Sequence, residues 1–522
     1  MIKRWIQFTL VFSLLLVYWP TNAQTFPTDD PVIKAIWKAA MDSSRLELLA
    51  HQLLDVHGPR LVGTPQSMKA HVWAVNQYSA WGIPAKNEEY GKWQGWERGI
   101  SHIDLLEPRV RSIEGTMLAW CPPTKKGGVT AGVVIFPDVA DSIAFLQWLP
   151  SVKGKFVLMA ALQPTGRPDK TWEEFALKPE FDRMKELRKT ILDNWDARLR
   201  KSGFRRDTLA QVLEHAGAAG LIGSQWANGY GVYRIFSANT TTIPTVDLNL
   251  EDYGLVYRLT ESSNKPILRI IAESKMLEPG PAMNTIATIR GTQKSDEYVM
   301  LSAHFDSWDG SSGATDNGTG TIMMMEAMRI LKQVYPNPKR TIITGHWDSE
   351  EQGLNGSKAF VKDHPEVVEK LQALFNQDNG TGRIVSLSSS GYMNAAEFLA
   401  RWIARIPSDV TSEVKLSFPG MPAGGGTDHA SFDAAGAPGF GLGSNSWDYG
   451  YTWHTNRDTY DKLVFDELKN NVVLIACLVY LASEDPQFIP RDRRVLPVNQ
   501  RTGQPGEWPV VRDPERAGRL KK

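Results

Sequence analysis

The stretch VMLSAHFDSWDGSSGATDNGTG, residues 299–320, decides how the fold of this chain is interpreted. Its apolar start predicts a buried strand that ends by presenting His304 and Asp306. A glycine-rich loop then carries Asp316 and Asn317, and the residues that follow predict a helix. Open α/β sheets bind ligands at the carboxyl ends of their strands. Imidazole and carboxylate groups in such a place suit a borderline metal ion such as zinc.

The composition is that of a large globular protein without a strongly charged partner. The chain has 522 residues, enough for a large core and for more than one domain. Lysine plus arginine equals aspartate plus glutamate, 58 of each. This balance gives no reason to expect nucleic acid or an anionic membrane surface as a partner.

The N-terminal segment has the pattern of a secretory signal peptide, residues 1–23. Two basic residues, Lys3 and Arg4, precede an apolar run, and small residues lead to a cleavage site after Ala23. The apolar run of about 15 residues is short for a membrane span, although an uncleaved anchor is the alternative. We therefore expect a secreted or periplasmic protein without stable membrane insertion after cleavage.

The mature chain keeps two cysteines, Cys121 and Cys477, which lie far apart in the sequence. A secreted protein could pair them. Because they fall in different parts of the expected fold, we predict two buried free thiols.

The order of apolar segments predicts one domain interrupted by another. Residues 24–116 form the N-terminal part of the main domain, and residues 277–489 resume it. Residues 117–276 form a separate insert of short strands around a charged helical segment, 170–201. The strands of the insert are expected within 133–136, 155–162, 218–224 and 241–259. Residues 490–522 are a tail rich in arginine and proline, expected to wrap the surface or to be loosely ordered.

In the resumed domain, strands alternate with helices. Strands are expected at 283–291, 297–306, 340–348, 373–378 and 437–444, and the last helix at about 466–483. This alternation predicts an α/β fold, a doubly wound and mostly parallel sheet with helices on both faces.

Four further clusters of acidic and histidine residues follow strands or lie in glycine-rich loops. They are Glu350-Glu351 in SEEQGLNGS, Asp378 in NQDNGTG, Asp428-His429 in GGGTDHASF and His454 in YTWHTNRDT. Each motif alone is weak evidence, because paired glutamates are commonly solvated and DNG is usually a turn. Their joint order is what indicates a metal site.

In that order, AHFDS, GATDNGTG, EEQGLNGS, QDN and WHTNRDT resemble the co-catalytic zinc exopeptidases over residues 280–480. That family includes secreted bacterial zinc aminopeptidases and the plasma and synaptic glutamate carboxypeptidases. HGPRLVGTPQS, residues 57–67, resembles the substrate-side start of such enzymes. Residues 215–224 and 243–259 resemble the β-rich protease-associated domain that commonly interrupts them.

The resemblance implies a role for each matching residue. His304 and Asp378 would bind one zinc ion, Glu351 and His454 the other, and Asp316 would bridge the two, giving two Zn²⁺ per chain. A hydroxide bridging the metal ions would be the nucleophile, and Glu350 the general base. Asp306 would accept the second imidazole N–H of His304 and fix its tautomer. The bond between Asp316 and Asn317 is the place where the family has a cis peptide.

The residues expected to contact substrate are less specific. Asp428 and His429 match a loop beside the substrate, where His429 could stabilise the oxyanion or the two could form a loop hydrogen bond. Tyr451 could form a pocket wall or pack in the core. Arg457 could clamp a substrate carboxylate or pair with Asp458.

The most consistent function is a secreted zinc exopeptidase acting on peptides, an aminopeptidase or dipeptidase. A carboxypeptidase of the glutamate carboxypeptidase type is the first alternative. Glutaminyl cyclisation on a related one-zinc fold and a non-catalytic binding relative are the others, and the complete set of five ligands argues against both. The resemblance is also compatible with a homodimer.

Overall fold

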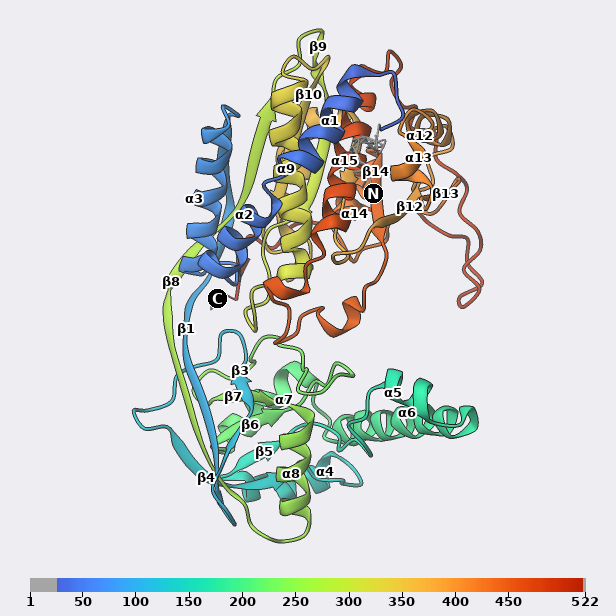
Figure 1. Cartoon of the computed structure of the whole chain (residues 1–522). Helices are drawn as coiled ribbons and strands as arrows, with labels where there is room; N and C mark the ends of the chain where they lie inside the picture. The colour runs from blue at the N-terminus through green and yellow to red at the C-terminus, as the bar shows by residue number, and fades with distance from the viewer. Residues whose placement is uncertain (1–25, 520–522) are drawn as a thin grey trace, which may run out of the picture.

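Two units joined by a pair of long antiparallel strands make up the protein (Figure 1). The computed structural model describes residues 26–519, so the predicted signal peptide lies outside the described residues. β1 (Ala85–Glu107) and β8 (Ile267–Ile289) pair along nearly their whole length. One end of this ribbon belongs to the sheet of the major unit, residues 26–98 and 274–519. The other end belongs to the insert unit, residues 101–272.

The sheet of the major unit runs in the order β13–β12–β14–β11–β9–β10–β8–β1. Its strands, besides β1 and β8, are β9 (Lys294–His304), β10 (Arg340–Trp347), β11 (Leu371–Asn376), β12 (Ile384–Ser388), β13 (Lys415–Ser417) and β14 (Gly439–Ser444). The four central strands β14, β11, β9 and β10 are parallel, and β8 and β12 flank them in the antiparallel sense. The predicted mostly parallel sheet is confirmed.

Helices cover both faces of this sheet. Residues of β9 alternate between two cores, because successive side chains of a strand point to opposite faces. Leu301 packs in the core formed with α9 (Thr319–Val334) and α15 (Phe465–Glu484). Met300 packs in the core that contains Phe360 and Phe432, on the face of the shorter helices. The fold is therefore doubly wound, as the sequence predicts.

The other helices of the major unit are α1 (Pro31–Asp42), α2 (Leu46–Ala50), α3 (Pro65–Ala80), α10 (Asn355–Asp363), α11 (Pro365–Glu369), α12 (Ala395–Ile403), α13 (Ser408–Thr411) and α14 (His429–Ala435). Short turns are η1 (His51–His57), η3 (Ala314–Gly318), η4 (Tyr449–Tyr451) and η5 (Tyr460–Lys462). The start of α1 follows from its sequence: the Asp30 carboxylate accepts the N–H groups of Val32 and Ile33, and Pro31 occupies the first turn. None of the described helices is both long and apolar enough to cross a bilayer.

The insert unit has a parallel sheet, and its hydrophobic core continues into the major unit through residues such as Trp93 and Trp308. Strands β4 (Val129–Ile135), β5 (Phe156–Leu158), β6 (Gly220–Gly223) and β7 (Thr245–Leu248) are parallel, and β3 (Gly115–Met117) closes the edge antiparallel to β7. Beside β1 lies β2 (Arg111–Ile113). The helical elements are α4 (Ser142–Trp148), η2 (Leu149–Val152), α5 (Asp169–Phe175), α6 (Lys178–Lys201), α7 (Arg206–His215) and α8 (Leu250–Glu261).

One expected strand of the insert is wrong in its second half. The strand predicted within residues 241–259 ends at Leu248, and α8 begins at Leu250. The Asn249 side chain accepts the N–H of Asp252 and so caps the helix. Tyr253 and Val256 then form part of its buried face, at the spacing of a helix.

The chain ends beside the ribbon. β15 (Ala517–Gly518) pairs in parallel with β1, so the tail returns across the major unit. Cys121 lies in the insert unit and Cys477 in α15, and both are buried free thiols, as predicted.

Candidate metal centre

The five predicted ligands come together at the carboxyl edge of the parallel strands. His304 is the last residue of β9, and Trp347 of β10 lies opposite it. Glu351 follows β10, and Asp378 follows β11. Asp316 lies in η3, and His454 lies in the long loop after β14. Since these strands run in the same direction, segments far apart in the sequence end at one place.

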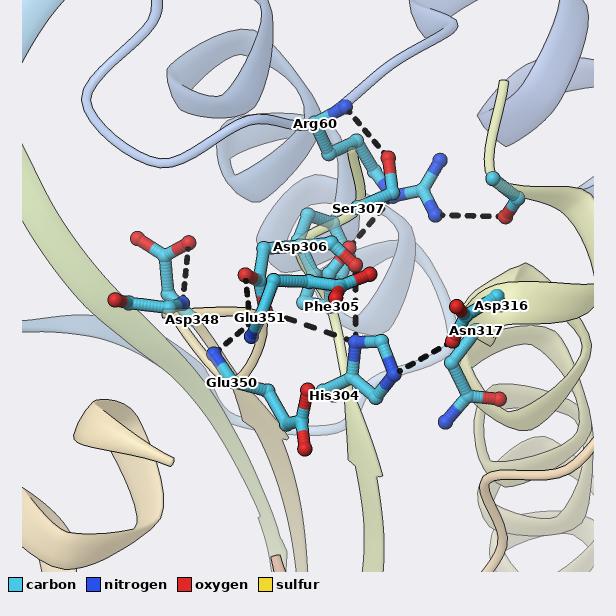
Figure 2. Close-up of polar contacts among 12 residues, drawn as sticks. Arg60, His304, Phe305, Asp306, Ser307, Asp316, Asn317, Asp348, Glu350 and Glu351 are labelled. Carbon is cyan, nitrogen blue, oxygen red and sulfur yellow. Dashed lines mark hydrogen bonds and ion pairs between the residues drawn. The ribbon is translucent and has the colours of Figure 1, made fainter. Parts of the chain in front are cut away.

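The ligand atoms form two clusters that share Asp316. In the first, His304 Nε2 lies 3.0 Å from Asp378 Oδ1 and 3.3 Å from Asp316 Oδ1. In the second, His454 Nε2 lies 2.7 Å from Glu351 Oε2 and 3.2 Å from Asp316 Oδ2. Figure 2 shows His304 with one ring nitrogen facing Asp316 and the other facing Asp306. The cis peptide implied at Asp316-Asn317 is present.

The donor set fits zinc. Among the described residues, Asp316 Oδ2, Glu351 Oε1 and His454 Nδ1 are buried without a hydrogen-bond partner. Three carboxylates and two imidazoles in a buried place need positive charge to balance them. Nitrogen and oxygen ligands of this kind are those that zinc takes.

The pKa values of these groups reflect the close packing of buried carboxylates and imidazoles. Burial lowers the pKa of His304, but the Asp378 carboxylate and the neighbouring acids outweigh burial and raise it well above its usual range. Burial raises the pKa of Glu351 to about 7, and Asp316 adds to the rise. A dication in this place would remove the cause of both shifts by favouring neutral imidazole and ionised carboxylate.

Glu350 is directly before the ligand Glu351 and keeps partial exposure to solvent. Burial raises the pKa of its carboxyl well above the usual range; His304 opposes this, and Asp378 and Asp428 reinforce it. A carboxylate with a raised pKa can both accept and return a proton near neutral pH.

Asp306 orients the other residues through its backbone and its carboxylate (Figure 2). His304 Nδ1 donates to the backbone oxygen of Asp306 at 3.0 Å, whereas the Asp306 carboxylate oxygen lies at 3.6 Å. The expected tautomer-fixing contact is therefore made mainly by the backbone. The carboxylate instead accepts the N–H groups of Glu350 and Glu351, at 3.0 and 3.3 Å, and so positions that pair.

Two residues that hold the metal-binding loop were not identified from the sequence. Arg60 is fully buried and donates to the carbonyl oxygens of Gly58, Phe305, Ser312 and Gly313. The Asp458 carboxylate, 2% exposed as a residue, accepts the N–H groups of Thr315 and Asp316 at 2.8 and 3.0 Å. The available signal for Arg60 was an arginine directly after Gly-Pro in the segment 57–67.

The predicted substrate-side residues separate into two groups. Asp428 is buried near the centre, and both of its carboxylate oxygens lack a hydrogen-bond partner among the described residues. His429 follows it at the start of α14, beside Gly441. Tyr451 and Arg457 face the insert unit instead.

For Arg457 and Tyr451 the contacts are specific. Arg457 pairs with Glu114 of the insert unit at 2.5 Å, not with Asp458. The Tyr451 ring lies 5.9 Å from the Lys170 ammonium, also of the insert unit. Both residues are therefore engaged in holding the two units together.

Aromatic rings from both units surround His454. Trp453 stacks on its imidazole with ring centroids 3.8 Å apart. Trp308 lies at 6.1 Å, and Phe236 of the insert unit meets the ring edge-on at 5.2 Å. The insert unit thus forms part of the wall of the candidate centre.

Comparison with known proteins gives a consistent result. Residues 284–479 match the family model described as Peptidase family M28. Carboxypeptidase Q of Mus musculus is 24% identical over 446 residues, which cover 84% of this chain and 86% of that protein.

The solved structures agree on the fold. A Peptidase M28 precursor from Shewanella amazonensis SB2B aligns with a TM-score of 0.65 and 23% identity, over 88% of this chain and 97% of that chain. A zinc aminopeptidase from Bacillus subtilis aligns with a TM-score of 0.54 and 20% identity, over 84% of this chain and 95% of that chain.

The fold, the donor set and these similarities define a zinc metallopeptidase, a hydrolase that acts on peptides. The part of the chain that matches the model of peptidase family M28 is residues 284–479.

Proposed function

We propose that the protein is a secreted exopeptidase that binds two zinc ions and uses Glu350 as its general base. The observation that carries the proposal is the pair of ligand clusters sharing Asp316, with Glu350 directly beside the ligand Glu351. His304 and Asp378 would hold one ion, and Glu351 and His454 the other. Bound zinc would polarise the scissile carbonyl group and acidify a water molecule.

The residues of the chain have separate tasks in this proposal. Glu350 takes the proton from the attacking water and returns it to the leaving nitrogen. Asp306 fixes the backbone of Glu350 and Glu351 through two hydrogen bonds. Asp458 and Arg60 hold the loop that carries Asp316.

We infer that the enzyme removes residues from the amino end of peptides or cleaves dipeptides. A free amine needs an acidic group, and Asp428 offers a buried carboxylate without a hydrogen-bond partner among the described residues. Arg457, the expected clamp for a substrate carboxylate, is instead paired with Glu114. A carboxypeptidase is the second candidate, because Carboxypeptidase Q matches most of this chain.

The test is digestion of a peptide mixture followed by mass spectrometry. The mixture holds free, N-blocked and C-blocked peptides, and Glu350→Gln is compared with Glu366→Gln, which alters an exposed glutamate. Removal of N-terminal residues only from peptides with a free amine, by the wild type and Glu366→Gln, supports the proposal. Trimming from the carboxyl end favours the second candidate, and unchanged cleavage by Glu350→Gln removes Glu350 from the mechanism.

The number of zinc ions is tested separately by elemental analysis. We expect two ions per wild-type chain, and one after Asp378→Asn, which affects only the cluster with His304. One ion in the wild type would contradict the two-zinc site and favour the cyclase-type alternative.

Secretion and the domain division are also part of the proposal. Residues 1–23 would be removed after Ala23, and the insert predicted at 117–276 would be a protease-associated domain. Mass spectrometry of the protein exported from its host would show the new N-terminus. The proposed homodimer is tested by light scattering of the purified protein.

A further inference from the structure

A large cavity lies in the insert unit, apart from the candidate metal centre. Its volume is about 550 Å³, within the range of small-molecule sites. It opens at the carboxyl ends of the parallel strands β5, β6 and β7, since Met159, Ser224 and Asp247 line it. Open parallel sheets bind ligands at this edge. The cavity therefore occupies a position in its own sheet like that of the metal centre in the major unit.

The most unusual group in this cavity is the carboxylate of Asp247. The residue is 3% exposed, and its Oδ2 is buried without a hydrogen-bond partner among the described residues. No ion pair with a described lysine, arginine or histidine reaches it within 4.0 Å. An isolated buried carboxylate is costly for a folded protein. A group that donates hydrogen bonds and carries positive charge would satisfy this carboxylate.

The neighbouring strand leaves room for this carboxylate. Gly223 of β6 pairs with Asp247 of β7, and a Cβ atom at Gly223 would lie 2.0 Å from Asp247 Oδ1. Any side chain at residue 223 would therefore displace the carboxylate. The absence of a side chain at Gly223 lets the acid lie at the wall of the cavity.

An arginine without an acidic partner lines the same cavity. Arg234 forms no ion pair within the described part of the chain, and its Nε is buried without a hydrogen-bond partner. Its guanidinium lies over the Trp453 ring at 5.2 Å. Although Asp247 and Arg234 carry opposite charges, they are too far apart to pair. Two separated charges of opposite sign complement a ligand that carries both.

The remaining walls combine apolar surface, unpaired polar atoms and two ion pairs, Arg188–Asp169 and Arg206–Asp196. Trp195, Leu209 and Leu250 line the cavity, and so do Gln163 and Ser224. Gln163 Oε1 and Ser224 Oγ are buried without hydrogen-bond partners among the described residues. The candidate metal clusters found in the described residues do not include any group of this cavity, so a metal ion is not the expected occupant.

We propose that this cavity binds a small zwitterion, an amino acid or a molecule of similar size with an ammonium group and a carboxylate. The ammonium group pairs with Asp247, the carboxylate pairs with Arg234, and an apolar side chain lies against Trp195 and Leu209. This second site is independent of the zinc chemistry and of the proposed function.

The test is isothermal titration calorimetry on the full-length, zinc-loaded protein. The probes are L-leucine and 6-aminohexanoate, which hold the two charges at different spacings. Two analogues of leucine each lack one charge: 3-methylbutylamine has no carboxylate, and 4-methylpentanoate has no amine. We expect one of the zwitterions to bind, and the matching single-charge analogues to bind about ten- to hundredfold more weakly.

Variants locate the binding. The affinity for the zwitterion should fall at least about tenfold in each of three variants, Asp247→Asn, Arg234→Gln and Gly223→Ala. Asp138→Asn, which alters an exposed acid of the same unit, should leave the affinity for the zwitterion unchanged. Glu350→Gln also leaves it unchanged, which separates the cavity from the candidate metal centre. Circular dichroism and melting curves identify the variants that fold. Because the three substitutions lie in different segments, the test can still be made if one variant does not fold.

Two results would overturn the proposal. One is the absence of binding by both zwitterions up to about 10 mM, a concentration that reveals even weak sites. The other is equal affinity for the wild type and the folded Asp247→Asn variant, which would place the ligand elsewhere.

Discussion

Substitution of Arg60 by lysine tests whether one buried guanidinium holds the metal-binding loop. Arg60 donates to Phe305 O at 2.6 Å, Ser312 O at 2.8 Å, and Gly313 O and Gly58 O at 3.0 Å. Three of these carbonyl groups belong to the loop between His304 and Asp316. Lysine keeps the charge but has a single nitrogen on a flexible stem, so it cannot reproduce the planar fork of arginine.

The magnitude follows from the bonds that are lost. If lysine keeps two of the four contacts, two charge-assisted hydrogen bonds disappear, each worth about 1.5–3 kcal/mol. The free energy of unfolding should fall by about 3–6 kcal/mol. At about 2 °C per kcal/mol, the melting temperature should fall by about 6–12 °C.

The assay combines thermal melting with zinc titration. The matched control is Arg205→Lys, because Arg205 has a side chain that is 84% exposed and a single acidic partner, Asp207. Arg60→Lys should melt lower and bind zinc more weakly, since Asp316 lies on the loop that is loosened. If Arg60→Lys has the melting temperature and the zinc affinity of the wild type, the guanidinium does not hold this loop.

Three further predictions concern other residues. Asp458→Asn leaves one of two backbone N–H groups unpaired, so zinc affinity should fall about tenfold in a chelator competition; unchanged affinity would contradict the positioning role. Phe236→Ala removes the insert's ring from His454, so KM should rise while the zinc content stays the same, and an unchanged KM would exclude this wall from substrate binding. Burial raises the pKa of Asp247 from 3.8 to about 7. Between these two pH values the folded state binds more protons than the unfolded state, so the free energy of unfolding falls as the pH rises from 3.8 to about 7. Asp247→Asn should therefore stabilise the protein by about 4 kcal/mol more at pH 8 than at pH 3, and a gap independent of pH would show that the carboxylate has a partner.

The candidate ligands were assigned through the order of five motifs and the family resemblance that this order carries, and the structure brings these residues together. His304 is the last residue of β9, Asp378 lies just beyond the end of β11 at Asn376, and Glu351 lies in the turn after β10, which ends at Trp347. Parallel strands bring their ends together. The alternation of strands with helices likewise predicted the doubly wound sheet. The prediction of the sheet needs only the neighbours of each residue along the chain, whereas the ligand roles depend on the family resemblance.

The features that the sequence did not predict depend on contacts between distant segments. Arg60 meets carbonyl groups about 250 positions away, which are backbone atoms without any sequence signature. Arg457 pairs with Glu114, 343 positions away, and not with its sequence neighbour Asp458. The helix over 250–261 was missed because its apolar residues follow a true strand without a glycine or proline between them.

The insert unit is part of the candidate metal centre through hydrogen bonds as well as through packing. The N–H of Ile235 donates to the carbonyl oxygen of His454 at 2.8 Å, so a predicted zinc ligand is held by the insert. Tyr233 N donates to Asn456 Oδ1, and Asn456 N donates to Tyr233 O, both at 3.1 Å. These bonds fix the loop at His454 and at Asn456, two residues further along the chain. A displacement of the insert unit relative to the ribbon would therefore move one ligand of the second cluster, whereas His304 and Asp378 follow strands of the major unit. The two clusters thus differ in one respect: His304 and Asp378 of the first are positioned by strands of the major unit, whereas His454 of the second also depends on the docking of the two units.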